Sequence, residues 1–187
     1  MADVREAVLW MQSPELFEGL TDPVCRSMLA SSYRKEFNSM ETIFLAGEPR
    51  KTIFLLMEGR AQVSQVSQNG NEVLLWLNLP GQVVGSLNLV PGGTHWSTAR
   101  AVNPCRVLMW DLPAFEANVE RHPALFRNVE RIIGRQSVEL HSRICEISTG
   151  TVWLRLAHEL IRLTDQIGRS VNGHFEIDRL LSVIWRE

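Results

Sequence analysis

The sequence predicts a mainly β domain, an all-β barrel or sandwich with flanking helices, followed by a long helix and a second, smaller domain. Short apolar runs alternate with turn residues about every 8 to 12 positions between residues 34 and 112. A helical period then replaces this pattern from residue 123 to about residue 147. A Ser-Thr-Gly-Thr segment at 148–151 separates the long helix from the remaining residues.

Two short helices are expected before the barrel. Residues 2–12 place apolar side chains at helical spacing, and Ser13-Pro14 ends this pattern because a residue before proline avoids the α region. Thr21 can cap a second helix with Pro23 in its first turn, running to about Ser31.

Seven apolar runs, bounded by Gly, Pro and Asn, are the candidate strands of the barrel. Asn69-Gly70 is the sharpest turn, because both residues tolerate positive φ and suit a two-residue type I′ hairpin. Strand 61–66 should therefore pair antiparallel with residues 72–77. The seven runs are 42–45, 52–57, 61–66, 72–79, 82–84, 97–102 and 106–111.

The helical part of the chain begins near Pro113, which can stand in a first turn, and is interrupted at His122-Pro123. The following helix, of roughly 25 residues, is about 38 Å long. Such a helix is longer than the barrel, so it packs across the barrel, pairs with a copy of itself, or does both on different turns. The predicted dimerisation residues, near heptad spacing, are Val129, Ile133, Gln136, Leu140, Ile144 and Ile147.

Residues 148–151 are the best candidate for a hinge. Thr151 can cap a helix over 152–167, and Gly168 can close it. A short strand over about 173–177 and a last helix over 178–185 are expected to follow.

Composition excludes several classes of protein. The formal charge of −2 on 187 residues gives no overall support for nucleic-acid binding, although a local basic patch is compatible with it. The widely separated Cys25, Cys105 and Cys145 predict neither a zinc site nor a disulfide framework, and an iron–sulfur cluster needs about four thiolates. Apolar runs are shorter than the roughly 20 residues that span a membrane, and residues 1–11 lack an apolar signal core, so a cytoplasmic protein is expected.

Several stretches, in order, resemble the Crp/Fnr family of transcriptional regulators. Each stretch is weak alone, but their order and spacing over residues 14–187 are specific together. The resemblance implies a cyclic-nucleotide-binding-like jelly-roll barrel, or double-stranded β-helix, as the sensor over 1–122. It further implies a dimerisation helix over 123–148 and a partial winged helix-turn-helix over 149–187. The carrying stretches are 44–48 (FLAGE), 53–63 (IFLLMEGRAQV), 69–72 (NGNE), 80–85 (PGQVVG) and 155–161 (RLAHELI).

The resemblance also implies an effector pocket around residues 85–98. In the family's cyclic-nucleotide sensors, a Glu after the glycine holds the ribose 2′-hydroxyl, and an Arg before a small hydroxyl residue pairs with the cyclic phosphate. Here Ser86 stands at the Glu position and Trp96 at the Arg position, while Ser97 keeps the hydroxyl. Arg100 lies about 13 Å further along the strand and is no direct substitute. Because an anion would be buried without its counter-charge, we expect no binding of cAMP or cGMP in the usual manner.

The family's long helix supplies the other wall of the pocket, here near Leu140 and His141. Trp96 is expected to pack in the core or form a pocket wall, and His95 to be a surface turn residue. A neutral or aromatic effector, a haem, or no ligand are the open alternatives. The predicted effector-pocket residues are Gly85, Ser86, Leu87, Asn88, Trp96, Ser97, Thr98, Leu140 and His141, and the candidate haem ligands, among which no pair stands out, are Met57, His95, His141 and Cys145.

A helix-turn-helix reads DNA through its second helix. The helix expected at 178–185 matches the first of that pair, and Glu187 is the last residue, so the recognition helix is expected to be missing. We therefore expect a dimeric, effector-sensing transcription regulator whose DNA-binding part is incomplete in this chain, either a shortened or frame-disrupted regulator or a natural remnant.

Two alternatives remain beside the regulator. One is a stand-alone effector-binding or signalling barrel without a DNA-binding role, in which the last residues are an unrelated helical cap. The other is a barrel enzyme of the cupin type, which needs a histidine cluster with a carboxylate on its strands, whereas His95 alone lies in the barrel region. Since neither a nucleophile–base pair nor a glycine-rich phosphate loop is present, we predict no enzymatic activity.

Overall fold

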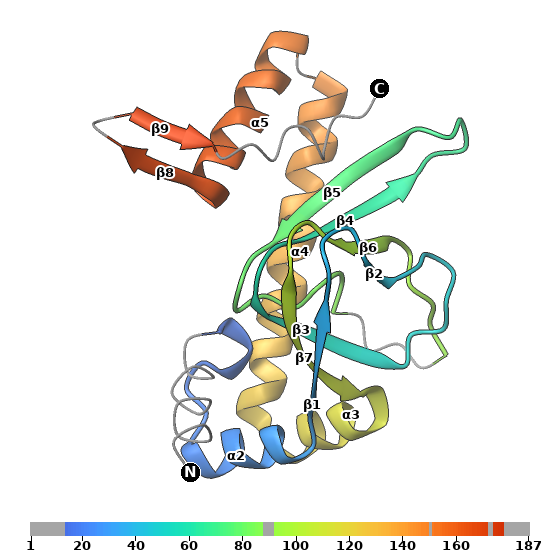
Figure 1. Ribbon diagram of the computed structural model, residues 1–187, viewed down its shortest axis with the longest axis vertical. Coiled ribbons are helices and arrows are strands. Elements are labelled where there is room, and N and C mark those ends of the chain that lie inside the picture. The colour runs from blue at the N-terminus through green and yellow to red at the C-terminus, as the bar shows by residue number, and fades with distance from the viewer. Residues whose placement is uncertain (1–13, 88–91, 150, 172–173, 178–187) are drawn as a thin grey trace. The chain divides into compact units, whose positions relative to one another are not determined.

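The computed structural model describes residues 14–87, 92–149, 151–171 and 174–177 (Figure 1). The helices expected at 2–12 and 178–185 lie outside these ranges. The chain forms two compact units, Met1–Gly134 and Arg135–Glu187, so the division falls inside the long helix. The domain boundaries expected from the sequence, at 122/123 and 148/149, stay a prediction.

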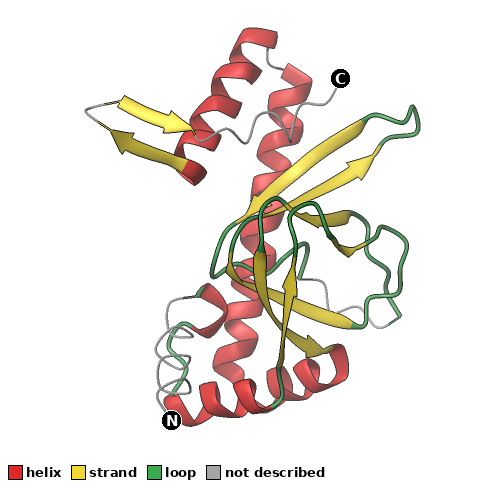
Figure 2. Ribbon diagram, viewed as in Figure 1, coloured by secondary structure: helices red, strands yellow, loops and turns green. Residues whose placement is uncertain are grey.

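The first unit is built from two antiparallel sheets that make the barrel, with helices beside them (Figure 2). One sheet has the strand order β1-β7-β3 and the other β2-β6-β4-β5. The jelly-roll class expected from the resemblance is therefore confirmed. The strands are β1 (Tyr33–Phe37), β2 (Thr42–Phe44), β3 (Thr52–Glu58), β4 (Ala61–Val66), β5 (Glu72–Asn78), β6 (Thr98–Ala101) and β7 (Cys105–Asp111).

The hairpin of β4 and β5 confirms the predicted pairing but not the predicted turn. The strands close at the pair Val66 and Glu72, which leaves residues 67–71 as the loop. The backbone N–H of Ser67 donates to the carbonyl of Asn71 at 2.8 Å, and Gly70 has φ +82°. Asn69 does not adopt positive φ, so the two-residue type I′ turn was wrong. Gly70 alone supplies the left-handed residue that this longer loop needs.

Two segments differ from the strands that the apolar runs predicted. β1 is an additional strand at the edge of its sheet, and four of its five residues are exposed. Its charged sequence, Tyr-Arg-Lys-Glu-Phe, gives no apolar run and suits an edge that must not pair with other chains. Residues 82–84 form no strand, because Val83 makes only an isolated bridge with Leu55.

The sheet β1-β7-β3 has apolar side chains on both faces because neighbouring residues of a strand point to opposite sides. One face packs into a helix-side core and the other into an interior core of the barrel. Ile53, Leu55, Leu108 and Trp110 belong to the helix-side core, and Phe54, Leu56, Val107 and Met109 belong to the interior core.

Most of the other side chains of the helix-side core come from η1 (Glu15–Phe17), α2 (Asp22–Ala30), α3 (Leu112–Arg121) and the start of α4 (Pro123–Thr149). Loop residues Leu20, Val83 and Leu87 supply the rest. Thr21 stands at the N-cap of α2 as predicted, although its side chain makes no capping hydrogen bond. The break between α3 and α4 falls at His122-Pro123, which confirms the prediction. Leu125, Val129 and Ile132 of α4 are at most 3% exposed.

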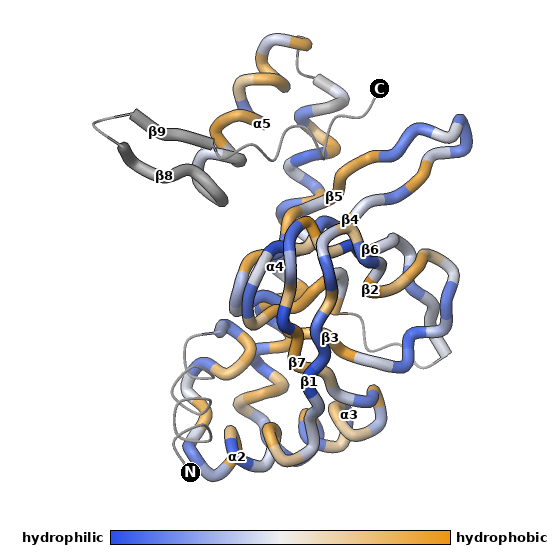
Figure 3. Tube along the Cα trace, in the orientation of Figure 1, coloured by the Kyte–Doolittle hydropathy of each residue, from blue (hydrophilic) through white to orange (hydrophobic). Residues whose placement is uncertain are grey.

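The second unit contains the end of α4, then α5 (Val152–Ile167), β8 (Gly168–Val171) and β9 (His174–Ile177). The predicted helix 152–167 is confirmed at both ends, and the N–H of Leu154 donates to Oγ1 of Thr151 at 3.4 Å, as the predicted cap requires. β8 was not predicted, since its sequence Gly-Arg-Ser-Val carries no strand period. Apolar residues recur along α5 (Figure 3). No helix in the described ranges is long and apolar enough to cross a membrane.

Candidate effector site

The cassette segment, residues 85–98, begins at a glycine that the structure requires. Gly85 has φ +79°, and a Cβ at this position would lie 2.7 Å from Cζ of Phe44. Its backbone N–H donates to Oδ1 of Asn78 at 3.1 Å, which attaches the cassette to β5. Both the left-handed backbone and the close approach of a ring exclude a side chain here. Asn88 lies outside the described residues.

The end of the cassette pairs with the segment between β2 and β3. The N–H of Gly47 donates to the carbonyl of His95 at 2.7 Å, and the N–H of His95 donates to the carbonyl of Glu48 at 2.9 Å. The N–H of Arg50 donates to the carbonyl of Gly93 at 2.9 Å. These backbone hydrogen bonds hold the cassette against a segment some 45 residues earlier in the chain.

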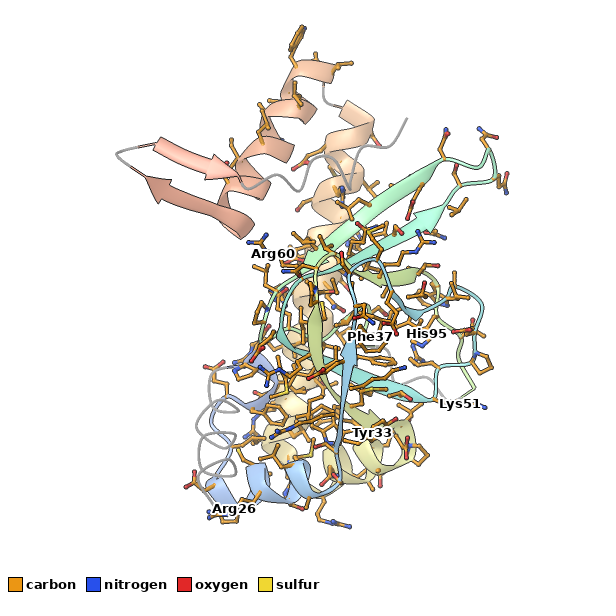
Figure 4. All side chains as sticks on the ribbon, in the orientation of Figure 1. Arg26, Tyr33, Phe37, Lys51, Arg60 and His95 are labelled. Atoms are coloured by element: carbon orange, nitrogen blue, oxygen red, sulfur yellow. The ribbon has the colours of Figure 1, made fainter. Side chains whose placement is uncertain are left out.

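His95 is part of an aromatic group rather than an exposed turn residue, so that expectation was wrong. Its ring stacks on Phe44, with centroids 3.9 Å apart and planes 14° apart, and Phe44 also contacts Phe54 at a centroid distance of 5.5 Å. The position of His95 in the first unit is labelled in Figure 4. Burial lowers the pKa of His95 below its ordinary value, and the charge of Arg50 lowers it further, against a smaller opposite effect of Glu48. The ring is therefore held in its neutral form.

The other predicted residues of the cassette lie in different environments. Trp96 is 69% exposed, so the expectation that it packs in the core was wrong. Ser97 is buried, and Leu87 belongs to the helix-side core. Ser86 is half-buried, and Oγ1 of Thr98 accepts a hydrogen bond from the N–H of Ala46 at 3.1 Å. The cassette therefore does not present these side chains as one continuous polar surface.

Leu140 and His141 belong to the second unit, so their role as a pocket wall stays a prediction. His141 is exposed, and its Nδ1 lies 2.8 Å from the carbonyl oxygen of Ser137 in the preceding turn of α4. Leu140 is half-buried.

Arg50 is a buried cation beside the cassette that the sequence interpretation missed. It is 7% exposed, and burial lowers its pKa while the carboxylate of Glu116 on α3 opposes this. A counter-charge was expected only within residues 85–98, whereas Arg50 reaches the cassette through the fold. Arg50 lies two residues before β3, and its burial was not expected because arginine is almost always exposed.

Trp76 is a second residue that the sequence interpretation did not assign to the site. It pairs with Val63 in the register of β4 and β5 and packs against the interior core. Its Nε1 is enclosed and has no hydrogen-bond partner. Only the register shift between Val63 and Ser64 fixes which face of the sheet Trp76 occupies, and periodicity alone does not show such a shift.

The predicted dimerisation residues divide along α4. Val129 is 2% exposed and is covered by the helix-side core of its own chain, whereas Ile133 and Ile144 are 38% and 62% exposed. Gln136 and Leu140 are half-buried, and the side chain of Ile147 is not described. The exposed apolar residues are therefore those toward the C-terminal end of the helix.

The candidate haem ligands of the first unit, Met57 and His95, belong to different cores. Met57 packs against the helix-side core, whereas His95 stacks on Phe44 of the interior core. His141 and Cys145 are exposed residues of the second unit. No group of three or more His, Cys, Asp or Glu side chains within the described ranges is placed to hold a metal ion.

Comparison with known proteins gives consistent matches. The cyclic nucleotide-binding domain family matches residues 34–122. The chain is 31% identical over 131 residues to the transcriptional regulator LdrP of Thermus thermophilus, covering 70% of this chain and 64% of the relative. It is 20% identical over 162 residues to a CRP-like cAMP-activated global transcriptional regulator of Mycobacterium tuberculosis, covering 87% and 72%. The sensor domain of the regulator DNR from Pseudomonas aeruginosa shares the fold, with a TM-score of 0.64 and 24% identity, covering 81% of this chain and all of that domain.

Proposed function

Because the chain belongs to the Crp/Fnr family of transcriptional regulators, we propose that its barrel is the sensor of a dimeric regulator that does not respond to cAMP in the usual manner. The single observation that carries the proposal is the exposed Trp96 at the position where the phosphate-binding arginine is expected. Ser86, in place of the ribose-binding glutamate, supports it.

The buried Arg50 does not replace that arginine in this proposal. Burial lowers the pKa of Arg50, and the opposite effect of the Glu116 carboxylate is smaller. Burial and the charge of Arg50 lower the pKa of the nearby His95. Neither residue stands at the arginine position that the family's cyclic-nucleotide sensors use, which Trp96 occupies here.

We further propose that the partners are a second copy of the chain and, for a form that carries a recognition helix, DNA. Exposed Ile133 and Ile144 on α4 are the side chains that a second copy would cover. The curated relatives are transcriptional regulators, not enzymes. The cytoplasm, where such regulators meet DNA, is the proposed location, and a small-molecule effector the proposed ligand.

Native mass spectrometry and calorimetric titration with cAMP and cGMP test this proposal together. We expect a dimer mass and no heat of binding for either nucleotide. A variant carrying Ser86→Glu and Trp96→Arg restores the two charges that the family uses, and we expect it to gain cAMP binding. Tight cAMP binding by the unchanged protein would overturn the proposal, and a monomer mass would favour the stand-alone barrel module.

A further inference from the structure

The strand partners of Trp76 show which face of the sheet β2-β6-β4-β5 its side chain occupies. Val63 of β4 pairs with Trp76 of β5 on one side and with Ala99 of β6 on the other. Val63 and Ala99 are both 0% exposed and belong to the interior core, against which Trp76 packs. Trp76 therefore presents its indole among apolar side chains on the interior face of the sheet β2-β6-β4-β5.

The indole N–H of Trp76 differs from that of Trp110 in the same unit. Nε1 of Trp110 donates to the carbonyl of Met28 at 2.8 Å, as buried indole groups usually do. Nε1 of Trp76 is also enclosed, yet no acceptor in the described chain lies within reach. A buried donor without a partner costs free energy that an acceptor from outside the chain would recover.

The same face of β5 also holds the start of the cassette. Asn78 lies two residues after Trp76, so both side chains are on one face of the strand. Asn78 is buried, and its Oδ1 accepts the hydrogen bond from Gly85 that attaches the cassette. A molecule bound at Trp76 would therefore lie on the strand face that positions the cassette.

The side chains around this donor indicate the chemistry of its ligand. The interior core contains the rings of Phe37, Phe44 and Phe54, and its other members are aliphatic or sulfur-containing side chains. A flat uncharged ring could contact these aromatic side chains without the cost of taking a charged group out of water.

We propose that Trp76 determines effector specificity by donating a hydrogen bond to an uncharged, planar heteroaromatic molecule that carries an acceptor, such as a ring nitrogen or a carbonyl. This rests on the proposed function, because it assigns the ligand class of the same sensor barrel. Trp76 thus binds the acceptor, and the aromatic residues of the interior core contact the ring.

Two probes of one shape separate this hydrogen bond from simple apolar binding. Benzimidazole carries a ring-nitrogen acceptor, and indole has the same bicyclic shape without it. Ligand-observed NMR titration of the full chain, at a mildly alkaline pH where both probes are uncharged, should show about 3- to 10-fold tighter binding of benzimidazole. Equal affinities would overturn the proposal.

Matched variants assign the difference to one nitrogen. Trp76→Phe keeps an aromatic ring without the N–H, and we expect the benzimidazole-to-indole ratio to fall to about 1. Trp153→Phe removes an exposed indole on α5, outside the predicted effector pocket, and should leave the ratio unchanged. An unchanged ratio in Trp76→Phe would overturn the assignment, and so would its loss in Trp153→Phe.

A second measurement does not depend on the folding of a variant. In the ¹⁵N-labelled chain, the Trp76 indole resonance should move downfield on adding benzimidazole and not on adding indole. A resonance that responds equally to both would overturn the proposal. The dimer mass and the cAMP titration of the same preparation test the proposed function separately. A dimer that binds no cAMP and shows no Trp76 response would keep the proposed function and overturn only the role of Trp76.

Discussion

The two ends of α4 carry similar apolar side chains and use them differently. Leu125 and Val129, in the first unit, are 0% and 2% exposed within the core beside the barrel. Val138 and Ile144, in the second, are 65% and 62% exposed. One helical pattern is thus satisfied inside the chain at one end and left uncovered at the other. An apolar stripe on a helix predicts that other apolar side chains pack against it, but it does not show whether they belong to the same chain.

The second unit extends this contrast beyond α4. Trp153 and Ile161 of α5 are 80% and 58% exposed, although α5 has a well-defined apolar pattern. Exposed apolar groups of this kind mark surfaces that bind other surfaces. The exposed apolar residues of α5 are therefore further candidates for contact with the proposed partner.

Truncating a core residue of the first unit should give the largest effect. We expect Leu125→Ala to lower the free energy of unfolding by about 2 to 5 kcal/mol, because it opens a cavity in a packed core. The matched change Val138→Ala, on the exposed end of the same helix, should cost less than about 0.5 kcal/mol in the monomer. Urea denaturation of both variants measures the two values, and similar losses would remove the contrast between the two ends.

Placing a charge on the exposed end should act on association instead. We expect Ile144→Glu to weaken the proposed dimer at least about tenfold, or about 1.4 kcal/mol, since two buried carboxylates would face each other. Sedimentation equilibrium over a dilution series measures this. Ser142→Glu, at an exposed position outside the predicted stripe, is the control. Equal weakening by both variants would show that this stripe is not the dimer contact.

A pair of glycine variants tests how tightly the barrel holds its cassette. Gly85→Ala adds both a strained positive φ and a contact with Phe44, and we expect a loss of about 1 to 3 kcal/mol. Gly47 has φ +86°, but a Cβ at this position would have nothing within 4 Å, so Gly47→Ala should lose less. Thermal unfolding of both variants measures the two losses of stability. Because both glycines have positive φ, the difference between the two losses reports the contact with Phe44 alone. Equal losses would mean that Phe44 moves away freely.

Most elements of the fold could be predicted from the sequence because the residues that begin and end each element lie next to it in the chain. The helix α5 lies between a Thr cap and a Gly, and β4 lies between Gly59-Arg60 and a polar loop, so both matched the structure at both ends. β1 and β8 were missed because their strands are made by pairing with β7 and β9 and not by an apolar period of their own.

The candidate site was less predictable, since its members come together only in three dimensions. Arg50 reaches the cassette through backbone pairing with Gly93, and Trp76 faces the interior because of a register shift between β4 and β5. Gly85 was identified as the start of the cassette, and its φ of +79° and the closeness of Phe44 agree with a glycine at this position. The burial of His95 depends on its stacking partner Phe44, some 50 residues away in the chain.

That burial predicts a small pH dependence of stability, confined to the first unit. Because the pKa of His95 is lowered in the folded state, the unfolded chain binds a proton first as the pH falls. The stabilisation is complete above the ordinary value of 6.5 and declines as the pH falls below it. His95→Phe keeps a ring against Phe44 without a titrating group, so its melting temperature should fall less between about pH 7.5 and about pH 5.5. An equal fall in both proteins would assign the acid sensitivity to other groups.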